Sequence, residues 1–243
     1  MPLAGGIVFG VLPLLVPVEL ARATGYAGDE PYVGQLAGAA TLGYAVALAL
    51  ELPAARWERL RIVVLAVLVF NVASIYACLV EIATGRGLPI VLLILGTSVA
   101  IVLITLALIS RHATPRSAPD IAPWLVWVIA VASALAAAFG MLPLLAPELG
   151  RGFGFAVTDV FLYRQGGAAT LGYAALGVYE LRSRRWQELR APSVMALVFN
   201  GASALASVLA LAAGDARPLV ALIAVAAGGV AILSAVALAR GGR

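Results

Sequence analysis

The sequence predicts an all-α integral membrane protein with eight transmembrane helices, formed by tandem duplication of a four-helix unit. Composition is the first reason, because 63% of the 243 residues are hydrophobic and only 12% are charged. Soluble domains contain about 45–50% apolar and about 25% charged residues, so this chain has too little polar surface for a water-soluble globule. The other two reasons are a series of long apolar segments and an internal repeat.

Most of the apolar segments approach the ~20 residues that a helix needs to cross a bilayer. The alternation typical of a membrane β-barrel does not occur, and lipid offers no partner to unpaired backbone groups, so each segment is expected to be a helix. The segments are residues 3–20, 33–50, 62–80, 88–110, 121–145, 162–179, 192–213 and 218–239.

The stretch GAATLGYA occurs at residues 38–45 and again at residues 167–174, and the copies are 167 − 38 = 129 positions apart. Apolar bias alone does not produce such an identity, which indicates an internal duplication. We therefore expect two four-helix units, residues 1–111 and 121–243, lying side by side and joined by a cytoplasmic linker, residues 112–120. Because four spans is an even number, both units have the same orientation, and a parallel pseudo-twofold axis along the membrane normal relates them.

Arginine is distributed unevenly between the links that join the apolar segments. Since an excess of arginine marks the cytoplasmic side, both termini are expected in the cytoplasm. The predicted location is the cytoplasmic (inner) membrane of a prokaryote. The arginines on the predicted cytoplasmic side are Arg56, Arg59, Arg61, Arg111, Arg116, Arg182, Arg184, Arg185, Arg190, Arg240 and Arg243, against Arg22, Arg86, Arg151, Arg164 and Arg217 on the other.

Uncharged polar residues recur at matching depths in both units and form a candidate polar seam. Thr41 and Tyr44 share one helix face, and Asn71 and Ser74 share a face of the following helix. We interpret the seam first as hydrogen-bonded helix packing, and second as a midplane site for a solute or lipid. Its eight residues are Thr41, Tyr44, Asn71 and Ser74, repeated as Thr170, Tyr173, Asn200 and Ser203.

Charged residues gather on the predicted outer face, also in two copies. Local ion pairing is the simplest interpretation, and a cation site on the pseudo-twofold axis is the alternative. Arg164 is expected just inside the hydrocarbon edge, where it either extends to the interface or contacts an anionic group. The outer-face residues are Glu19, Arg22, Glu30, Glu148, Arg151, Asp159 and Arg164.

Tryptophan and arginine recur together at the predicted cytoplasmic interface. Such residues commonly anchor a membrane protein at headgroup depth and attract anionic lipid. Docking of a partner protein is the alternative interpretation. The predicted interface anchors are Arg56, Trp57 and Arg61, repeated as Arg185, Trp186 and Arg190.

Several residue types that membrane enzymes and cofactor proteins use are scarce in this chain. His112 is the only histidine and Cys78 the only cysteine, so we expect no bis-histidine haem, no buried Ser–His pair and no cysteine metal site within one chain. The middles of the apolar segments lack acids, which does not favour a proton-driven transporter. We therefore predict no catalytic residue, no metal and no cofactor, and we favour a non-catalytic protein, with an enzyme kept as an open alternative. Lipid is the expected partner, with other membrane subunits or a second copy possible and nucleic acid not expected.

Three functional hypotheses follow. The first is a non-catalytic accessory or scaffold subunit of a membrane complex, which the small-residue helix faces and short loops favour. The second is a transporter of a small solute or a lipid, in which the polar seam forms the site. The third is an outer-face lipid-modifying enzyme that uses Glu148, Asp159 and Arg164.

Overall fold

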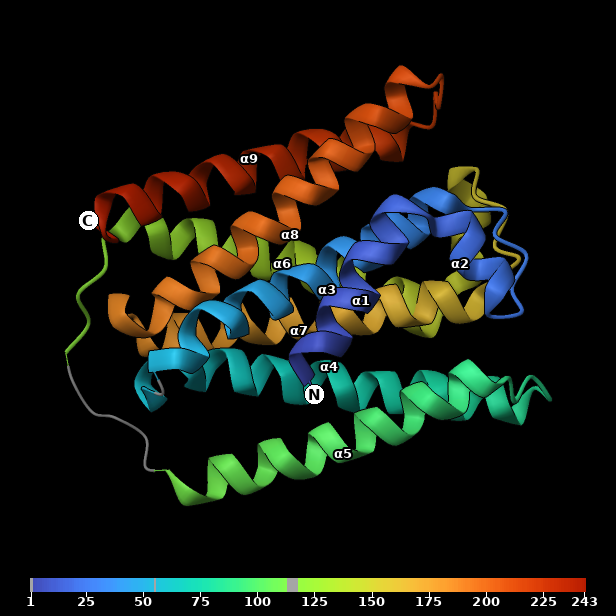
Figure 1. The fold of residues 1–243 in the computed structure, drawn as a ribbon. Coiled ribbons are helices and arrows are strands. Elements are labelled where there is room, and N and C mark those ends of the chain that lie inside the picture. The colour runs from blue at the N-terminus through green and yellow to red at the C-terminus, as the bar shows by residue number, and fades with distance from the viewer. Residues whose placement is uncertain (1, 55, 113–117) are drawn as a thin grey trace.

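The computed structural model describes residues 2–54, 56–112 and 118–243, and helices are the only regular structure in these ranges (Figure 1). Residues 113–117 of the predicted linker, including Arg116, lie outside the described residues. The elements are α1 (Pro2–Leu15), α2 (Pro17–Ala23), α3 (Pro31–Glu51), η1 (Leu52–Ala54), α4 (Trp57–Ala83), α5 (Pro89–Arg111), α6 (Pro123–Leu145), η2 (Pro147–Phe153), α7 (Val160–Ser183), α8 (Trp186–Ala212) and α9 (Pro218–Arg240).

Within the described ranges, 6 helices are long and apolar enough to cross a membrane, namely α3, α4, α5, α6, α8 and α9. The sequence predicted eight spans, and the difference has two physical reasons. The first predicted span is divided, since α1 has 14 residues and ends before Pro17. The second reason is that α7, which contains the sixth predicted span, carries Arg164, Glu180 and Arg182, and these charged residues lower its mean hydropathy.

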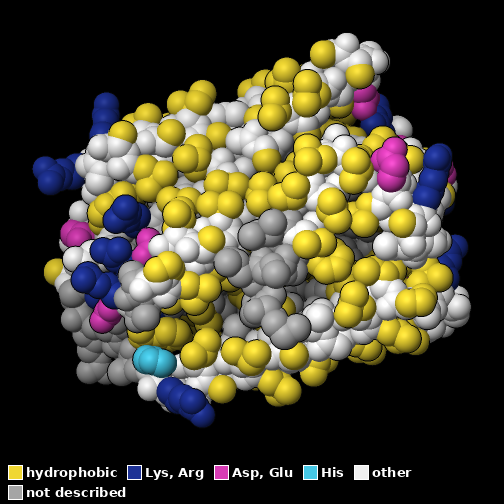
Figure 2. Space-filling model, in the orientation of Figure 1, with side chains coloured by type: hydrophobic (Ala, Val, Ile, Leu, Met, Phe, Trp, Pro, Cys, Tyr) yellow, Lys and Arg dark blue, Asp and Glu magenta, His cyan; other side chains and the backbone are white. Residues whose placement is uncertain are grey.

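The surface has the polarity of a protein embedded in lipid. Figure 2 shows charged side chains at the two ends of the drawn face and hydrophobic side chains over the broad region between them. Large apolar side chains of the described helices are freely exposed, including Val225 (77%), Trp127 (73%) and Ile232 (66%). Soluble proteins rarely expose such a continuous apolar surface, so the protein is an integral membrane protein whose helices contact the bilayer.

Proline sets the start of several helices. Pro31, Pro89, Pro123 and Pro218 begin α3, α5, α6 and α9, where the fixed φ of proline suits a helix and its missing N–H is not needed. Two more prolines, Pro17 and Pro147, follow residues of nearly the same conformation. Val16 has φ −136° and ψ 56°, and Ala146 has φ −134° and ψ 58°, so the chain turns in the same way after α1 and after α6.

The helices of the two predicted units interleave instead of forming two bundles side by side. In the first half α1 packs on α3 and α4 packs on α5. In the second half α6 packs on α7 and α8 packs on α9. Across the two units, however, α4 packs on α7 and α8 packs on α3, while α3 and α7 cross in the centre (Figure 1).

The two copies of GAATLGYA meet at this central crossing. The hydroxyl of Tyr44 donates to the carbonyl of Ala169 at 2.9 Å, and the hydroxyl of Tyr173 donates to the carbonyl of Ala40 at 2.8 Å. Both tyrosines are buried, and their ring centroids are 4.9 Å apart.

A glycine makes room for each tyrosine of the crossing. A Cβ on Gly43 would lie 2.0 Å from the Tyr173 hydroxyl, and one on Gly172 would lie 2.0 Å from the Tyr44 hydroxyl. Backbone carbonyls of α8 and α4 also lie within 3 Å of these Cβ positions. The repeated stretch therefore forms a close, hydrogen-bonded contact between the two halves.

We predict that Gly43→Ala and Gly172→Ala each lower the thermal unfolding midpoint of the purified protein in detergent by at least about 2 °C. The added methyl overlaps a tyrosine hydroxyl and a fixed backbone carbonyl, and such overpacking costs about 1–3 kcal/mol. Gly201→Ala in α8 is the matched control, because no atom lies within 4 Å of its Cβ position. Equal midpoints for Gly43→Ala and Gly201→Ala would show that the crossing is not tight.

Candidate functional site

A cavity of about 440 Å³ lies between the α6–α7 pair and the α8–α9 pair. It exists because α6 packs closely on α7 and α8 on α9, whereas few contacts join α7 to α8 or α6 to α9. At one end the two pairs are tied together, since the Ala122 amide donates to the Gly242 carbonyl at 3.0 Å. Residues of α3 and η2 complete the walls. We call this space the α6–α9 cleft.

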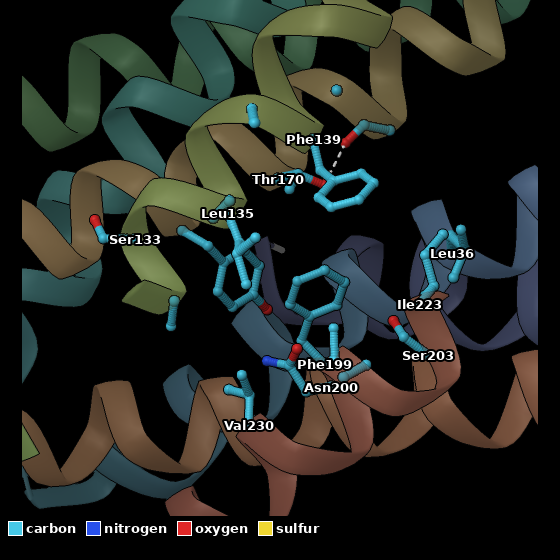
Figure 3. Close-up of a pocket in the computed structure, with 18 of the residues that line it drawn as sticks. Leu36, Ser133, Leu135, Phe139, Thr170, Phe199, Asn200, Ser203, Ile223 and Val230 are labelled. Atoms are coloured by element: carbon cyan, nitrogen blue, oxygen red, sulfur yellow. Dashed lines mark hydrogen bonds between the residues drawn. The ribbon is translucent and has the colours of Figure 1, made fainter. Parts of the chain in front are cut away.

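Most of the cleft wall is apolar, with polar groups placed along it. Figure 3 shows Leu135 and Phe139 of α6 on one side, and Phe199 and Asn200 of α8 on the other. Polar groups reach the cleft from α6, α7, α8 and α9, so all four walls contribute. The polar lining residues are Ser133, Tyr163, Thr170, Tyr173, Glu180, Ser193, Asn200, Ser203 and Ser234.

The polar groups near the middle of the cleft keep unused hydrogen-bonding capacity. The Thr170 hydroxyl donates to the Gly166 carbonyl at 2.9 Å, and the Asn200 amide donates to the Ala196 carbonyl at 2.9 Å. These are bonds within one helix, which leave the lone pairs of the hydroxyl and the amide oxygen for another partner. The Ser203 hydroxyl oxygen is buried and has no hydrogen-bond partner among the described residues.

The structure places the two copies of the predicted polar seam differently. Thr170, Tyr173, Asn200 and Ser203 all line the cleft, whereas no residue of the first copy does.

In the first copy, Thr41 and Asn71 donate within their own helices, to Ala37 and Val67. Ser74 bonds Gln165 of α7 at 2.8 Å and Ser98 of α5 at 3.3 Å. Among the described residues no hydrogen bond joins Thr41 or Tyr44 to Asn71 or Ser74, since α4 packs on α7 rather than on α3.

At the end of the molecule away from the Ala122–Gly242 bond, a carboxylate from each half accepts hydrogen bonds from a loop of the other half. Glu30 accepts a hydrogen bond from the Ala156 amide at 2.7 Å. Asp159 accepts from the Ala27 amide at 2.9 Å and from the Gly28 amide at 2.7 Å. Glu30 and Asp159 precede α3 and α7 directly and occupy matching positions of the repeat, since 159 − 30 = 129.

Aromatic rings also stack between the two halves at this end. Tyr26 stacks on Phe161 with centroids 5.7 Å apart, and Phe155 stacks on Tyr32 with centroids 6.3 Å apart. Tyr26 corresponds to Phe155 and Tyr32 to Phe161 at the 129-residue offset. Each loop therefore packs on the helix of the other half.

Arg217, for which the sequence indicated no partner, is the main cation at this end. Its guanidinium binds Glu30 at 2.8 Å and Asp215, and it lies 4.2 Å from the Phe155 ring centroid. These bonds raise the pKa of Arg217 and lower the pKa of Asp215 from their ordinary values. Of the other predicted outer-face charges, Glu148 and Arg151 form an exposed pair at 2.6 Å, and Glu19 and Arg22 are exposed.

Arg164 lies near a buried acid that sequence reasoning missed. Its Nε atom is buried without a hydrogen-bond partner among the described residues, and the same holds for Glu81 Oε1 and the Tyr26 hydroxyl. Arg164 and Arg86 both act electrostatically on Glu81, which is 2% exposed. The sequence feature that could have indicated this buried acid is the position of Glu81 directly after the apolar segment 62–80.

The predicted interface anchors divide into exposed and buried groups. Arg56 and Arg190 are exposed, whereas Arg61 and Arg185 both pair with the fully buried Glu188, which also accepts from the Ser183 hydroxyl. Other contacts tie both tryptophans to the protein. Trp57 stacks on His112 at 4.6 Å, and the Trp186 amide donates to Asp120 at 2.6 Å.

In the described ranges, no group of three or more His, Cys, Asp or Glu residues is placed so that it could hold a metal ion. Comparison with known proteins provided no relative: no family model, no curated protein and no solved structure matches the chain. Function must therefore be inferred from the cleft and from the residues that line it.

We predict that Asp159→Ala destabilises the protein, because it leaves the amides of Ala27 and Gly28 without an acceptor. Leaving a buried donor unsatisfied costs about 1–3 kcal/mol. The thermal unfolding midpoint should fall, and the exchange of both amides with solvent deuterium should accelerate. Asp29→Ala is the matched control, since Asp29 lies exposed in the same loop. If both variants unfolded at the wild-type temperature, the Asp159 carboxylate would not contribute to stability, which contradicts the prediction.

Proposed function

We propose that the protein is a membrane-embedded carrier that binds a small apolar or amphiphilic molecule in the α6–α9 cleft and moves it within or across the bilayer. The observation that carries the proposal is the cleft itself, whose volume of about 440 Å³ falls in the usual range for small-molecule sites, about 300–1,000 Å³. An apolar wall with a few polar groups suits a molecule that enters from the lipid.

The polar groups around Asn200 supply a reason for selectivity. A solute entering between α6 and α9 meets Thr170, Asn200 and Ser203 at about the middle of these helices, where each has hydrogen-bonding capacity left. In an apolar setting such groups favour a molecule that carries a hydroxyl, carbonyl or amine, because unmet polar groups are costly there.

We also propose that eight helices cross the membrane, with α1 and α7 as the additional spans, and that the chain arose by tandem duplication. The paired geometry supports this: Tyr44 and Tyr173, Glu30 and Asp159, and Val16 and Ala146 each repeat one local arrangement. Two units in the same orientation, related by a parallel pseudo-twofold axis between α3 and α7, account for all these pairs. The units are the predicted residues 1–111 and 121–243.

For location we propose the cytoplasmic membrane of a prokaryote, with both termini in the cytoplasm. The support is the clustering of arginines at the end that holds the Ala122–Gly242 bond, together with the positive-inside rule.

The accessory-subunit hypothesis has less support than the carrier hypothesis. Exposed apolar faces on α5 and α9 suit a partner subunit, but lipid covers such faces equally well. The lipid-modifying enzyme has the least support. Asp159 is occupied by two backbone amides, and Glu148 is exposed and paired with Arg151, so these groups do not converge with Arg164 on one reaction centre.

We predict that Ala226→Trp blocks the cleft, because Ala226 lines it and tryptophan adds a large ring. The probe is dodecanol carrying a diazirine, photolysed with the protein in lipid nanodiscs, and the labelled peptides are mapped by mass spectrometry. Labelling of α6–α9 lining residues should fall at least fivefold. Ala221→Trp, which adds the same ring to an exposed position of α9, should leave this labelling unchanged. Equal labelling in both variants, or none in the cleft of the wild type, contradicts the proposed site.

The proposed topology predicts which residues a membrane-impermeant maleimide can reach. In a Cys78→Ser background, Asp29→Cys should react in intact cells, whereas Arg190→Cys should react only after lysis. Both positions are exposed at opposite ends of the molecule, so accessibility is not limited by burial. Labelling of Arg190→Cys in intact cells would reverse the orientation.

A further inference from the structure

Glu180 is a buried carboxylate in the wall of the cleft. It belongs to α7, lines the cleft and is 6% exposed. The hydrogen bonds and ion pairs of the described residues include none to its carboxylate oxygens. A carboxylate in an apolar wall is costly unless a proton or a cation neutralises it.

The corresponding glutamate in the first half does have a partner. Glu51 stands 129 positions before Glu180 and is equally buried, but it pairs with Arg59 at 3.5 Å. The residue that corresponds to Arg59 is Glu188, since 188 − 59 = 129, so the second half has an acid where the first has a base.

The arginines that might have replaced Arg59 are already occupied by that acid. Arg61 and Arg185 both pair with Glu188, and the Ser183 hydroxyl binds it as well. Arg184 is exposed and directs its Nε to the Leu181 carbonyl at 3.0 Å. Among the described residues, Glu180 therefore lines the cleft without a paired arginine, whereas Glu51 pairs with Arg59.

Glu180 also lies at a useful distance from the middle of the cleft. It is ten residues after Thr170 on α7, which corresponds to about 15 Å along a helix axis. Between them the wall is formed by residues such as Leu176 and Gly177. A molecule with a charged head at Glu180 would thus lay an extended chain along the apolar wall.

We propose that the cleft binds a cationic amphiphile, a long-chain amine or quaternary ammonium, whose head pairs with Glu180 and whose chain extends past Thr170. This inference rests on the proposed function, because it needs the cleft to admit an apolar chain. Glu180 supplies the charge that selects the head, and the apolar wall accepts the tail. A zwitterionic phospholipid is disfavoured, since its phosphate would accompany its ammonium group toward the carboxylate.

The test uses displacement of the diazirine-dodecanol photolabel from the cleft in nanodiscs of one lipid composition. The competitors are dodecyltrimethylammonium, dodecanol and dodecyl sulfate, which share one chain and differ in head charge. With the wild type, the cation should displace the label at a concentration at least tenfold below that of dodecanol, and the sulfate should be the weakest competitor. Glu180→Gln should remove the preference for the cation over dodecanol.

Glu51→Gln is the matched control, because it removes the same charge from the paired glutamate outside the cleft, and it should keep the tenfold preference. Glu180→Asp, which retains the charge, should keep most of it. Equal displacement by cation and dodecanol in the wild type overturns the inference while the cleft remains a site for apolar chains. Absence of photolabel from the wild-type cleft contradicts both proposals. The wild-type comparison decides the matter even if Glu180→Gln does not fold.

Discussion

The close crossing of α3 and α7 is the contact on which the rest of the structure depends. At this point each tyrosine hydroxyl occupies the space that a glycine on the opposite helix leaves open, and it donates to a backbone carbonyl of that helix. In lipid, helices are not driven together by the hydrophobic effect, so close approach and interhelical hydrogen bonds must supply the attraction. The GAATLGYA stretch provides both in two copies.

The arrangement of the other helices follows from this crossing. Because α3 and α7 occupy each other's inner faces, α4 packs on α7 and α8 packs on α3, each across the boundary between the halves. Glu30 and Asp159, at the starts of α3 and α7, also reach across the boundary, since each accepts hydrogen bonds from the loop of the other half. As a consequence α8 and α9 stand away from α6 and α7, and the space between these pairs becomes the cleft.

Differences between the halves are more informative about function than their similarity. The glutamates Glu51 and Glu180 lie 129 positions apart, and among the described residues Glu51 pairs with Arg59 whereas Glu180 forms no ion pair. Asn71 and Asn200 each bond their own helix, but only Asn200 faces the cleft. Under the proposed duplication and carrier function, one half serves stability and the other serves binding, and the different surroundings of these glutamates and asparagines mark that division.

The helical membrane fold was predictable from composition and segment length, and the importance of GAATLGYA from its exact recurrence. The partners of its tyrosines were not, because adjacent helices in the chain were assumed to be adjacent in space, whereas Tyr44 bonds Ala169 in the other half. The burial of three acids was not predicted either. Glu81, Glu180 and Glu188 stand at the ends of apolar runs, where sequence alone does not distinguish a residue at the interface from one enclosed by neighbouring helices.

The most direct test of the account is an engineered disulfide across the central crossing. The Cβ position of Gly166 lies 3.5 Å from the Cβ of Ala37, within the usual range for cystine, about 3.5–4.5 Å. In a Cys78→Ser background, the pair Ala37→Cys and Gly166→Cys should form a disulfide in membranes under mild oxidation, seen as a change in gel mobility after cleavage between the halves. The pair Ala37→Cys and Gly229→Cys should not. Failure of the first pair to cross-link, with both cysteines accessible to a membrane-permeant maleimide, would contradict the crossing of α3 and α7 and the cleft that depends on it.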